Sequence, residues 1–318
     1  MTRSTDPRHL TNVSAPRDPG NDGGRLHVAS TEGAVAPSAA AGTAGNGEST
    51  RADVGDSAAR PYYVAVGDEE DVFKAAYLQG LSILLKGPTG CGKTRFVEAM
   101  AHDLGRPLIT VACHDDLTTA DLVGRFLLVG GDTQWVDGPL TRAVREGAIC
   151  YLDEVVEARQ DTTVVLHPLA DHRRQLPVER LGVTLAAAPG FGLVVSYNPG
   201  YQSVLKDLKD STRQRMVALE FDFPNADIEE KIVATEAGIS SDHAAQLVRF
   251  GQAIRRLETG GLREVASTRV LIAAGRLIAQ GLPAPKAARA AIAGPLSDDP
   301  AITNGLIQMI EVYLNEDA

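Results

Sequence analysis

Short runs of apolar residues recur along the first two thirds of the chain, and stretches with helical spacing separate them. Apolar runs of this length, bounded by polar or turn-forming residues, are typical of strands buried inside a parallel sheet. The predicted strands span residues 81–85, 107–112, 148–154, 192–197 and 217–221. Helices are expected between them, among them 68–79, 93–104, 138–146 and 161–171. Strands that alternate with helices predict an α/β fold with a mostly parallel sheet.

Two further patterns mark departures from this alternation. Residues 125–136 and 174–187 each contain two short extended segments around a glycine-containing turn, which predicts two β-hairpins. From Pro224 onward the apolar spacing is helical only. The helices predicted there span about 226–237, 241–258, 268–281, 284–293 and 300–315.

The first 60 residues have a different composition from the rest. They are rich in Ala, Gly, Ser, Thr and Asp and contain almost no large apolar side chain. Such a segment buries too little surface to offset its ordering entropy, so we expect it to be disordered. The sequence therefore predicts a disordered tail (1–60), an α/β domain with two hairpin insertions (61–223) and an all-helical domain (224–318).

One stretch between the strand at 81–85 and the following helix carries a phosphate-binding pattern. It matches G-x-x-x-x-G-K-[ST] at every fixed position and consists of Gly87, Pro88, Thr89, Gly90, Cys91, Gly92, Lys93 and Thr94. The glycines let backbone N–H groups turn toward a polyphosphate, and the helix adds its positive end. Lys93 can reach the β- and γ-phosphates of ATP, and the Thr94 hydroxyl can ligate Mg²⁺. A glycine-rich turn that matches by chance is the alternative, and the strand–loop–helix context argues against it. Cys91 occupies a variable position, where a small residue fits the turn.

Polar residues at the ends of two later strands complete a candidate site. Asp153 and Glu154 end the strand at 148–154, at the edge of the sheet where such folds bind ligands. Asp153 is expected to help hold Mg²⁺, and Glu154 to polarise the attacking water as a general base. Asn198 ends the next buried strand, where its amide could bond both the water and the γ-phosphate. The alternative for Asp153 and Glu154 is that they are ordinary solvated acids. The alternative for Asn198 is a turn residue, since Asn-Pro-Gly is a good turn.

Three arginines are further candidates. Arg213 and Arg215 precede the last strand, and a cation near the γ-phosphate would stabilise transition-state charge. Arg269 begins a helix of the second domain. From the residues alone, all three could instead lie on solvated helix faces.

The composition excludes several classes of protein. The net charge of −10 argues against broad nucleic-acid binding, which needs a basic face. Three cysteines without paired spacing do not form a disulfide framework. No apolar run has the length of a membrane span, and the N-terminus lacks an apolar signal core, so we expect a cytoplasmic protein. His114-Asp115-Asp116 has no second ligand cluster at suitable spacing, which favours a structural or interface role.

From about residue 61 to its C-terminus the chain resembles the MoxR-type AAA+ ATPases, within them the CbbQ/NirQ/NorQ branch. Six sequence blocks carry the resemblance: 85–98, 111–117, 121–125, 137–141, 152–159 and 196–202. The resemblance implies a parallel five-stranded sheet in three α/β/α layers, followed by an all-α lid. It also implies site roles: Gly87 to Thr94 as Walker A, Asp153 and Glu154 as Walker B, Asn198 as sensor 1, Arg215 (with Arg213 as a close rival) as arginine finger, and Arg269 as sensor 2.

The same resemblance implies a function. Relatives hydrolyse ATP with Mg²⁺, form hexameric rings and act with a partner that carries a von Willebrand factor A domain. Their targets are Rubisco for the CbbQ type and nitric oxide reductase for the NirQ/NorQ type, and we favour Rubisco here. Two alternatives stay open: a monomeric small-molecule P-loop kinase, which would need neither Arg269 nor Asn198, and a DNA-acting AAA+ protein, against which the acidic charge speaks.

Overall fold

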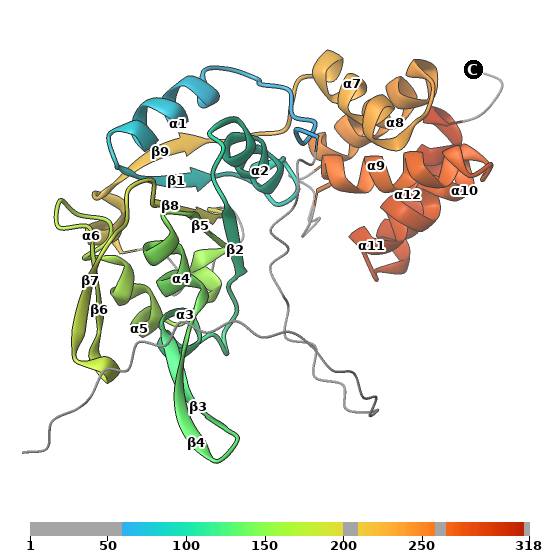
Figure 1. Cartoon of the computed structure of the whole chain (residues 1–318). Helices are drawn as coiled ribbons and strands as arrows, with labels where there is room; N and C mark the ends of the chain where they lie inside the picture. The colour runs from blue at the N-terminus through green and yellow to red at the C-terminus, as the bar shows by residue number, and fades with distance from the viewer. Residues whose placement is uncertain (1–58, 200–208, 258–264, 315–318) are drawn as a thin grey trace, which may run out of the picture. The chain divides into compact units, whose positions relative to one another are not determined.

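The computed structural model describes residues 59–199, 209–257 and 265–314 (Figure 1). The predicted tail of residues 1–60 lies outside the described residues except for Ala59 and Arg60.

A parallel sheet of five strands forms the centre of the α/β part. Its strands are β1 (Ser82–Lys86), β2 (Leu108–Ala112), β5 (Ile149–Asp153), β8 (Gly192–Tyr197) and β9 (Met216–Glu220). They lie in the order β2-β5-β8-β1-β9, and all neighbours run parallel. The predicted α/β class and five-stranded parallel sheet are confirmed.

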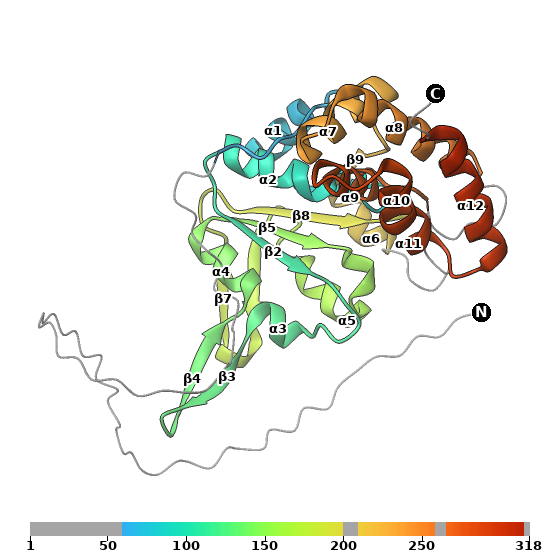
Figure 2. The same cartoon turned by 90° about the vertical axis from the view of Figure 1, so that its right-hand side faces the viewer.

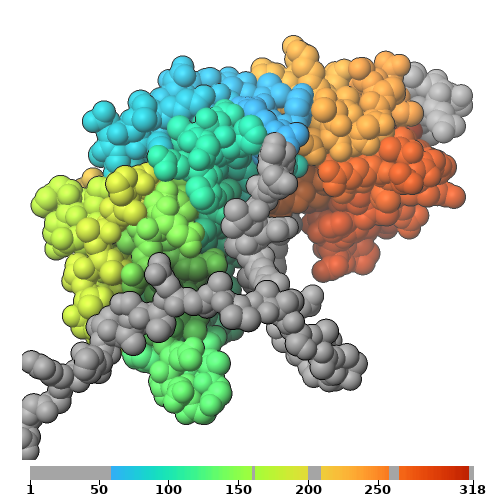
Figure 3. Space-filling model, in the orientation of Figure 1, coloured from blue at the N-terminus to red at the C-terminus, as the bar shows by residue number. Residues whose placement is uncertain are grey.

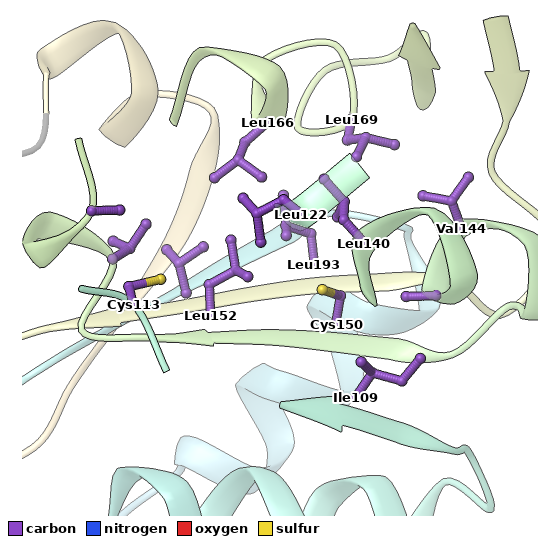
Figure 4. Close-up of a cluster of buried hydrophobic side chains, with 14 of the residues drawn as sticks. Ile109, Cys113, Leu122, Leu140, Val144, Cys150, Leu152, Leu166, Leu169 and Leu193 are labelled. Carbon is purple, nitrogen blue, oxygen red and sulfur yellow. The ribbon is translucent and has the colours of Figure 1, made fainter. Parts of the chain in front are cut away.

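Alternate residues of the central strands pack into two separate hydrophobic clusters. Ile83 and Tyr151 point to a cluster with helices α1 (Glu69–Leu78) and α2 (Lys93–Asp103). Leu84 and Leu152 belong to a cluster on the other face, with α4 (Pro139–Glu146). Figures 1 and 2 show α1 and α2 on one side of the sheet and α4 on the other, and Figure 4 shows the second cluster in detail. This burial on both faces explains why the strands are apolar throughout.

Both predicted hairpins form. Helix α3 (Thr119–Val123) leads into β3 (Gly124–Val129), which pairs with β4 (Asp132–Asp137). The second hairpin pairs β6 (Gln175–Val178) with β7 (Val183–Ala186), and the 3₁₀ turn η3 (Glu179–Leu181) joins them.

The first hairpin carries exposed apolar residues at its end. Leu128 is 76% exposed, and Figure 3 shows the hairpin as a green projection. Near its base, Trp135 packs edge-on against Phe126 with 5.2 Å between ring centroids. The indole Nε1 donates to Asp137 Oδ1 at 2.6 Å.

The helix predicted over 161–171 is wrong. After the 3₁₀ turn η1 (Val155–Glu157), the chain forms only α5 (Gln160–Thr163) and the 3₁₀ turn η2 (Val164–Leu166). Pro168 has no N–H to continue the helical ladder, and the β-branched residues before it favour helix weakly. Before β9 the described residues form the short helix α6 (Asp210–Arg213).

The C-terminal part is helical and has a hydrophobic cluster of its own. Its elements are α7 (Ala226–Ala237), α8 (Ser241–Arg256), α9 (Thr268–Ala279), α10 (Ala284–Ala288), the π-helical turn η5 (Arg289–Ala293), α11 (Gly294–Leu296) and α12 (Pro300–Tyr313). Asn225 and Ser240 cap α7 and α8 through their side-chain oxygens. The all-helical character is as predicted, while the domain boundaries at 60/61 and 223/224 stay predictions.

Candidate nucleotide-binding site

The phosphate loop joins β1 to α2, as the sequence predicts. Gly92 caps α2 with φ at 107°, a conformation that favours glycine. Gly87 has φ at 155°, and a Cβ added there would lie 2.3 Å from the backbone oxygen of Phe221. Both positions therefore require glycine, and the loop delivers the free N–H groups of the α2 N-terminus to the carboxyl edge of the sheet.

Lys93 points into the loop. Its side chain is only 5% exposed, and Nζ donates to the carbonyl oxygens of Gly87 at 2.7 Å and Pro88 at 2.9 Å. The ammonium group is thus held within the concave side of the loop, where it can bind an anionic phosphate.

Asp153 is oriented by three hydroxyl groups. Its Oδ1 accepts from Tyr151 Oη at 2.7 Å and from Ser196 Oγ at 2.6 Å. Its Oδ2 accepts from Thr94 Oγ1 at 3.3 Å. Burial raises the pKa of Tyr151, so its phenol keeps its proton and acts as a donor. Thr94 and Asp153 together offer the hard oxygen ligands that Mg²⁺ prefers.

Glu154 stands in a strained backbone conformation beside this network. Its φ of 56° is left-handed, which is uncommon for a residue other than glycine. Its N–H donates to Ser196 Oγ at 3.0 Å, so the serine that orients Asp153 also fixes the Glu154 backbone. Burial raises the pKa of the Glu154 carboxyl; the nearby Lys93 and Arg269 cations oppose this rise. A raised pKa strengthens a carboxylate as a proton acceptor.

Asn198 lies at the same edge of the sheet. It is 5% exposed, and its Nδ2 donates to Thr89 Oγ1 of the phosphate loop at 3.4 Å. The structure therefore brings the predicted sensor amide next to the loop.

A cavity of about 1040 Å³ opens over the loop. The predicted site residues that line it are Thr89, Gly90, Cys91, Gly92, Lys93, Thr94, Asp153, Glu154 and Arg269. Arg269 lies in the first turn of α9, at the side of the cavity formed by the C-terminal helices. The cavity thus combines cations, carboxylates and backbone donors in one place.

Arg213 and Arg215 lie elsewhere. Met216, directly after Arg215, pairs with the first residue of β1, whereas the phosphate loop follows the last residue of β1. The amino end of β1, where Arg215 lies, is therefore about 16 Å from its carboxyl end, where the phosphate loop begins. Arg215 bonds the Ser211 carbonyl oxygen, and Arg213 pairs with Asp210 at 2.5 Å. The predicted arginines are therefore not part of their own chain's cavity lining.

Sequence reasoning missed several residues that shape the site. Ser196 and Tyr151 lie in apolar strands, where a hydroxyl gives no signal of its own. The segment before α1 forms one wall of the cavity, and Glu69 holds it by accepting from the N–H groups of Val66 at 2.7 Å and Gly67 at 2.8 Å. From the sequence, an acidic residue at the start of a helix indicates only a favourable interaction with the helix dipole, so the contacts of Glu69 with the preceding segment could not be predicted.

Over residues 59–199, 209–257 and 265–314, no group of three or more His, Cys, Asp or Glu side chains is placed to hold a metal ion. Within the same residues no helix is long and apolar enough to cross a bilayer.

Two protein families match the chain. The AAA domain (dynein-related subfamily) matches residues 82–216, and the CbbQ/NirQ/NorQ C-terminal family matches residues 229–313. The chain is 60% identical to the denitrification regulatory protein NirQ of Stutzerimonas stutzeri, over 80% of this chain and 92% of that protein. The chain belongs to the CbbQ/NirQ/NorQ family of AAA ATPases.

Other members of the family are similar to the same extent. Protein NorQ of Paracoccus denitrificans is 60% identical over 77% of this chain and 91% of that protein. Protein CbbQ of Hydrogenophilus thermoluteolus is 56% identical over 77% of this chain and 92% of that protein. Membership of the CbbQ/NirQ/NorQ family confirms the predicted resemblance and implies nucleotide binding and ATPase activity; AAA proteins are typically oligomeric.

The bond between Ser196 and Asp153 leads to a first prediction. Ser196→Ala removes a donor that orients the carboxylate, and loss of such a supporting bond typically lowers metal affinity about 10- to 100-fold. We therefore expect a fluorescent ATP analogue to need 10- to 100-fold more Mg²⁺ for tight binding. Thr141→Val is the control, because that buried hydroxyl bonds the Val123 carbonyl in another part of the core. An unchanged Mg²⁺ titration for Ser196→Ala would refute the orienting role.

Proposed function

We propose that the chain is a Mg²⁺-dependent ATPase that uses hydrolysis to remodel a target enzyme. The observation that carries the proposal is the meeting of Lys93, Thr94 and Asp153 with Glu154 in one cavity. Such a site positions a polyphosphate and stabilises the charge that develops on it, which accounts for most of the catalysis in phosphoryl transfer.

Each residue has a distinct task in this proposal. The backbone N–H groups of residues 87–94 and the Lys93 ammonium bind the phosphates of ATP. Thr94 and Asp153 hold Mg²⁺, which supplies neutralisation of phosphate charge. Glu154 accepts a proton from the attacking water, and Asn198 orients that water by hydrogen bonding. Arg269 adds a cation from the helical side of the cavity.

The arginine finger is proposed to act on a neighbouring subunit. Arg215 lies at the amino end of β1, whereas its own phosphate loop follows the carboxyl end, and this separation supports a role in trans. Arg213 is the rival candidate. This role requires a ring, and we propose a hexamer, as the family resemblance implies. The resemblance also implies a partner with a von Willebrand factor A domain.

The target enzyme is proposed as one of two. The relatives are named denitrification regulatory protein NirQ, protein NorQ and protein CbbQ. The family resemblance links the first two names to nitric oxide reductase and the third to Rubisco, so the relatives favour neither target. Affinity capture with a Glu154→Gln chain, which should retain ATP and hold its target, distinguishes them. The kinase and DNA-acting alternatives gain no support from the family match.

The proposal is tested most directly at Lys93. Lys93→Ala removes at least one charge-assisted bond to the phosphates, worth about 1.5–3 kcal/mol, so ATP affinity should fall at least about 10- to 100-fold. Isothermal titration with ATP and Mg²⁺ measures the effect. Lys286→Ala, at an exposed position of α10, is the matched control and should bind ATP as the parent chain does. Equal affinities for both variants would contradict the proposed site.

A further inference from the structure

A buried carboxylate in the C-terminal helices receives three hydrogen bonds from two other segments. Glu229 of α7 is 0% exposed. Its Oε2 accepts from Arg255 Nη1 at 2.8 Å and its Oε1 from Arg255 Nη2 at 2.6 Å, so the pair is bidentate. Thr268 Oγ1 also donates to Oε1, at 2.6 Å. The charge is thereby fully paired inside the helical cluster.

The rest of the Arg255 guanidinium contacts two connecting segments. Its Nε donates to the Ala266 carbonyl oxygen at 2.7 Å, just before α9. Its central carbon lies 4.0 Å from the ring centroid of Phe223, on the segment between β9 and α7. One planar group therefore fixes the entry to α7 and the entry to α9 together.

Both segments lead into the nucleotide cavity. Phe223, Thr268 and Arg269 all line it. Ser267 packs directly on the phosphate loop, because a Cβ added to Gly90 would lie 2.6 Å from Ser267 Cβ. Arg269 is close enough to Glu154 to oppose the rise in the pKa of that carboxyl. The first turn of α9 thus faces the part of the cavity where Glu154 lies.

Stability alone does not account for this pair. A buried ion pair is often no more stabilising than well-packed apolar residues of the same volume. A bidentate pair also fixes orientation, because the planar guanidinium fork donates both hydrogen bonds to a carboxylate in one plane only.

We propose that Glu229, Arg255 and Thr268 are positioning residues that hold the first turn of α9 so that Arg269 contacts the terminal phosphate of the nucleotide. We call these three residues the α9 clamp. The inference rests on the proposed function, because it takes ATP as the ligand of the cavity. The α9 clamp, although it is remote from the phosphate loop in sequence, would thereby help the site to distinguish ATP from ADP.

The test is a pair of double-mutant cycles. Thr268→Val keeps the side-chain shape and removes one donor, and Glu229→Gln removes the charge. Each is made alone and together with Arg269→Ala, and affinities for ATP and ADP are measured in the full chain. Coupled residues typically change an affinity severalfold to about a hundredfold. We expect each clamp variant to lower ATP affinity severalfold or more, to change ADP affinity less, and to have no further effect once Arg269 is Ala.

A core variant separates positioning from simple destabilisation. Val233→Ala truncates a fully buried side chain on the same helix as Glu229. It should lower the melting temperature without changing the ratio of ATP to ADP affinity. If Glu229→Gln does not fold, Thr268→Val carries the test.

Three outcomes would overturn the inference. In the first, a clamp substitution lowers ATP affinity by the same factor whether residue 269 is Arg or Ala. In the second, a clamp substitution lowers the affinities for ATP and ADP equally. In the third, a clamp variant folds and binds both nucleotides as tightly as the parent chain. Failure of the proposed function looks different, because the parent chain itself would then bind no ATP.

Discussion

Glu154→Gln is expected to bind ATP with nearly parental affinity and to hydrolyse it about 10²- to 10⁴-fold more slowly. The amide keeps the size of the side chain and cannot accept a proton from water. The backbone bond from Glu154 N–H to Ser196 remains, so the neighbouring Asp153 should keep its orientation. Single-turnover hydrolysis and ATP titration on the same preparation measure the two quantities separately.

The pH profile supplies an independent check on the same residue. Because burial raises the pKa of Glu154, its base form is lost on acidification at a higher pH than for an ordinary glutamate, whose pKa is about 4.5. Turnover should therefore fall on the acid side of the profile before exposed carboxylates titrate. Glu146→Gln, at the exposed end of α4, is the matched control and should retain turnover within a few-fold. If Glu154→Gln also stays within a few-fold, Glu154 is not the general base.

Arg215→Ala is expected to leave ATP binding intact and to reduce hydrolysis by as much as about 10³-fold, the size of arginine-finger effects in well-studied GTPases. The reason is that a guanidinium near the γ-phosphate stabilises charge that develops only in the transition state. Arg213→Ala, two residues away, is the matched comparison, because it tests the rival arginine on the same short segment.

Mixing experiments show whether the arginine acts across a subunit boundary. Arg215→Ala and Lys93→Ala chains should each be inactive alone. In a mixed ring, some interfaces combine an intact phosphate loop with an intact arginine from the neighbour, so part of the activity should return. If mixed rings assemble, no activity returns and Arg213→Ala behaves like the parent chain, then the assignment of Arg215 in trans is wrong.

The main elements of this fold could be predicted because their signals are local. The strands are apolar throughout, since Ile83 and Leu84 pack on opposite faces of one sheet, and the phosphate loop is a contiguous pattern. The predicted helix over 161–171 is wrong because helical apolar spacing there is followed by Pro168, which cannot donate the next helical hydrogen bond. Helical spacing shows where side chains point and does not show whether the backbone can continue.

The supporting residues of the site could not be predicted for a different reason. Ser196 meets Asp153 only when two strands distant in sequence become neighbours in the sheet. Glu229 and Arg255 resemble charged residues of an amphipathic helix, which are usually solvated. Their burial depends on how α7, α8 and the start of α9 pack, and no short stretch of sequence carries that information.

The position of Trp135 gives the protein a built-in optical reporter. It is the single tryptophan of the chain, and it lies on the β3–β4 hairpin against Phe126 with its indole bonded to Asp137. Intrinsic fluorescence excited at the indole band therefore comes from this hairpin and from no other element. A change in emission when nucleotide or a second protein is added would report directly on the surroundings of the hairpin, without any label.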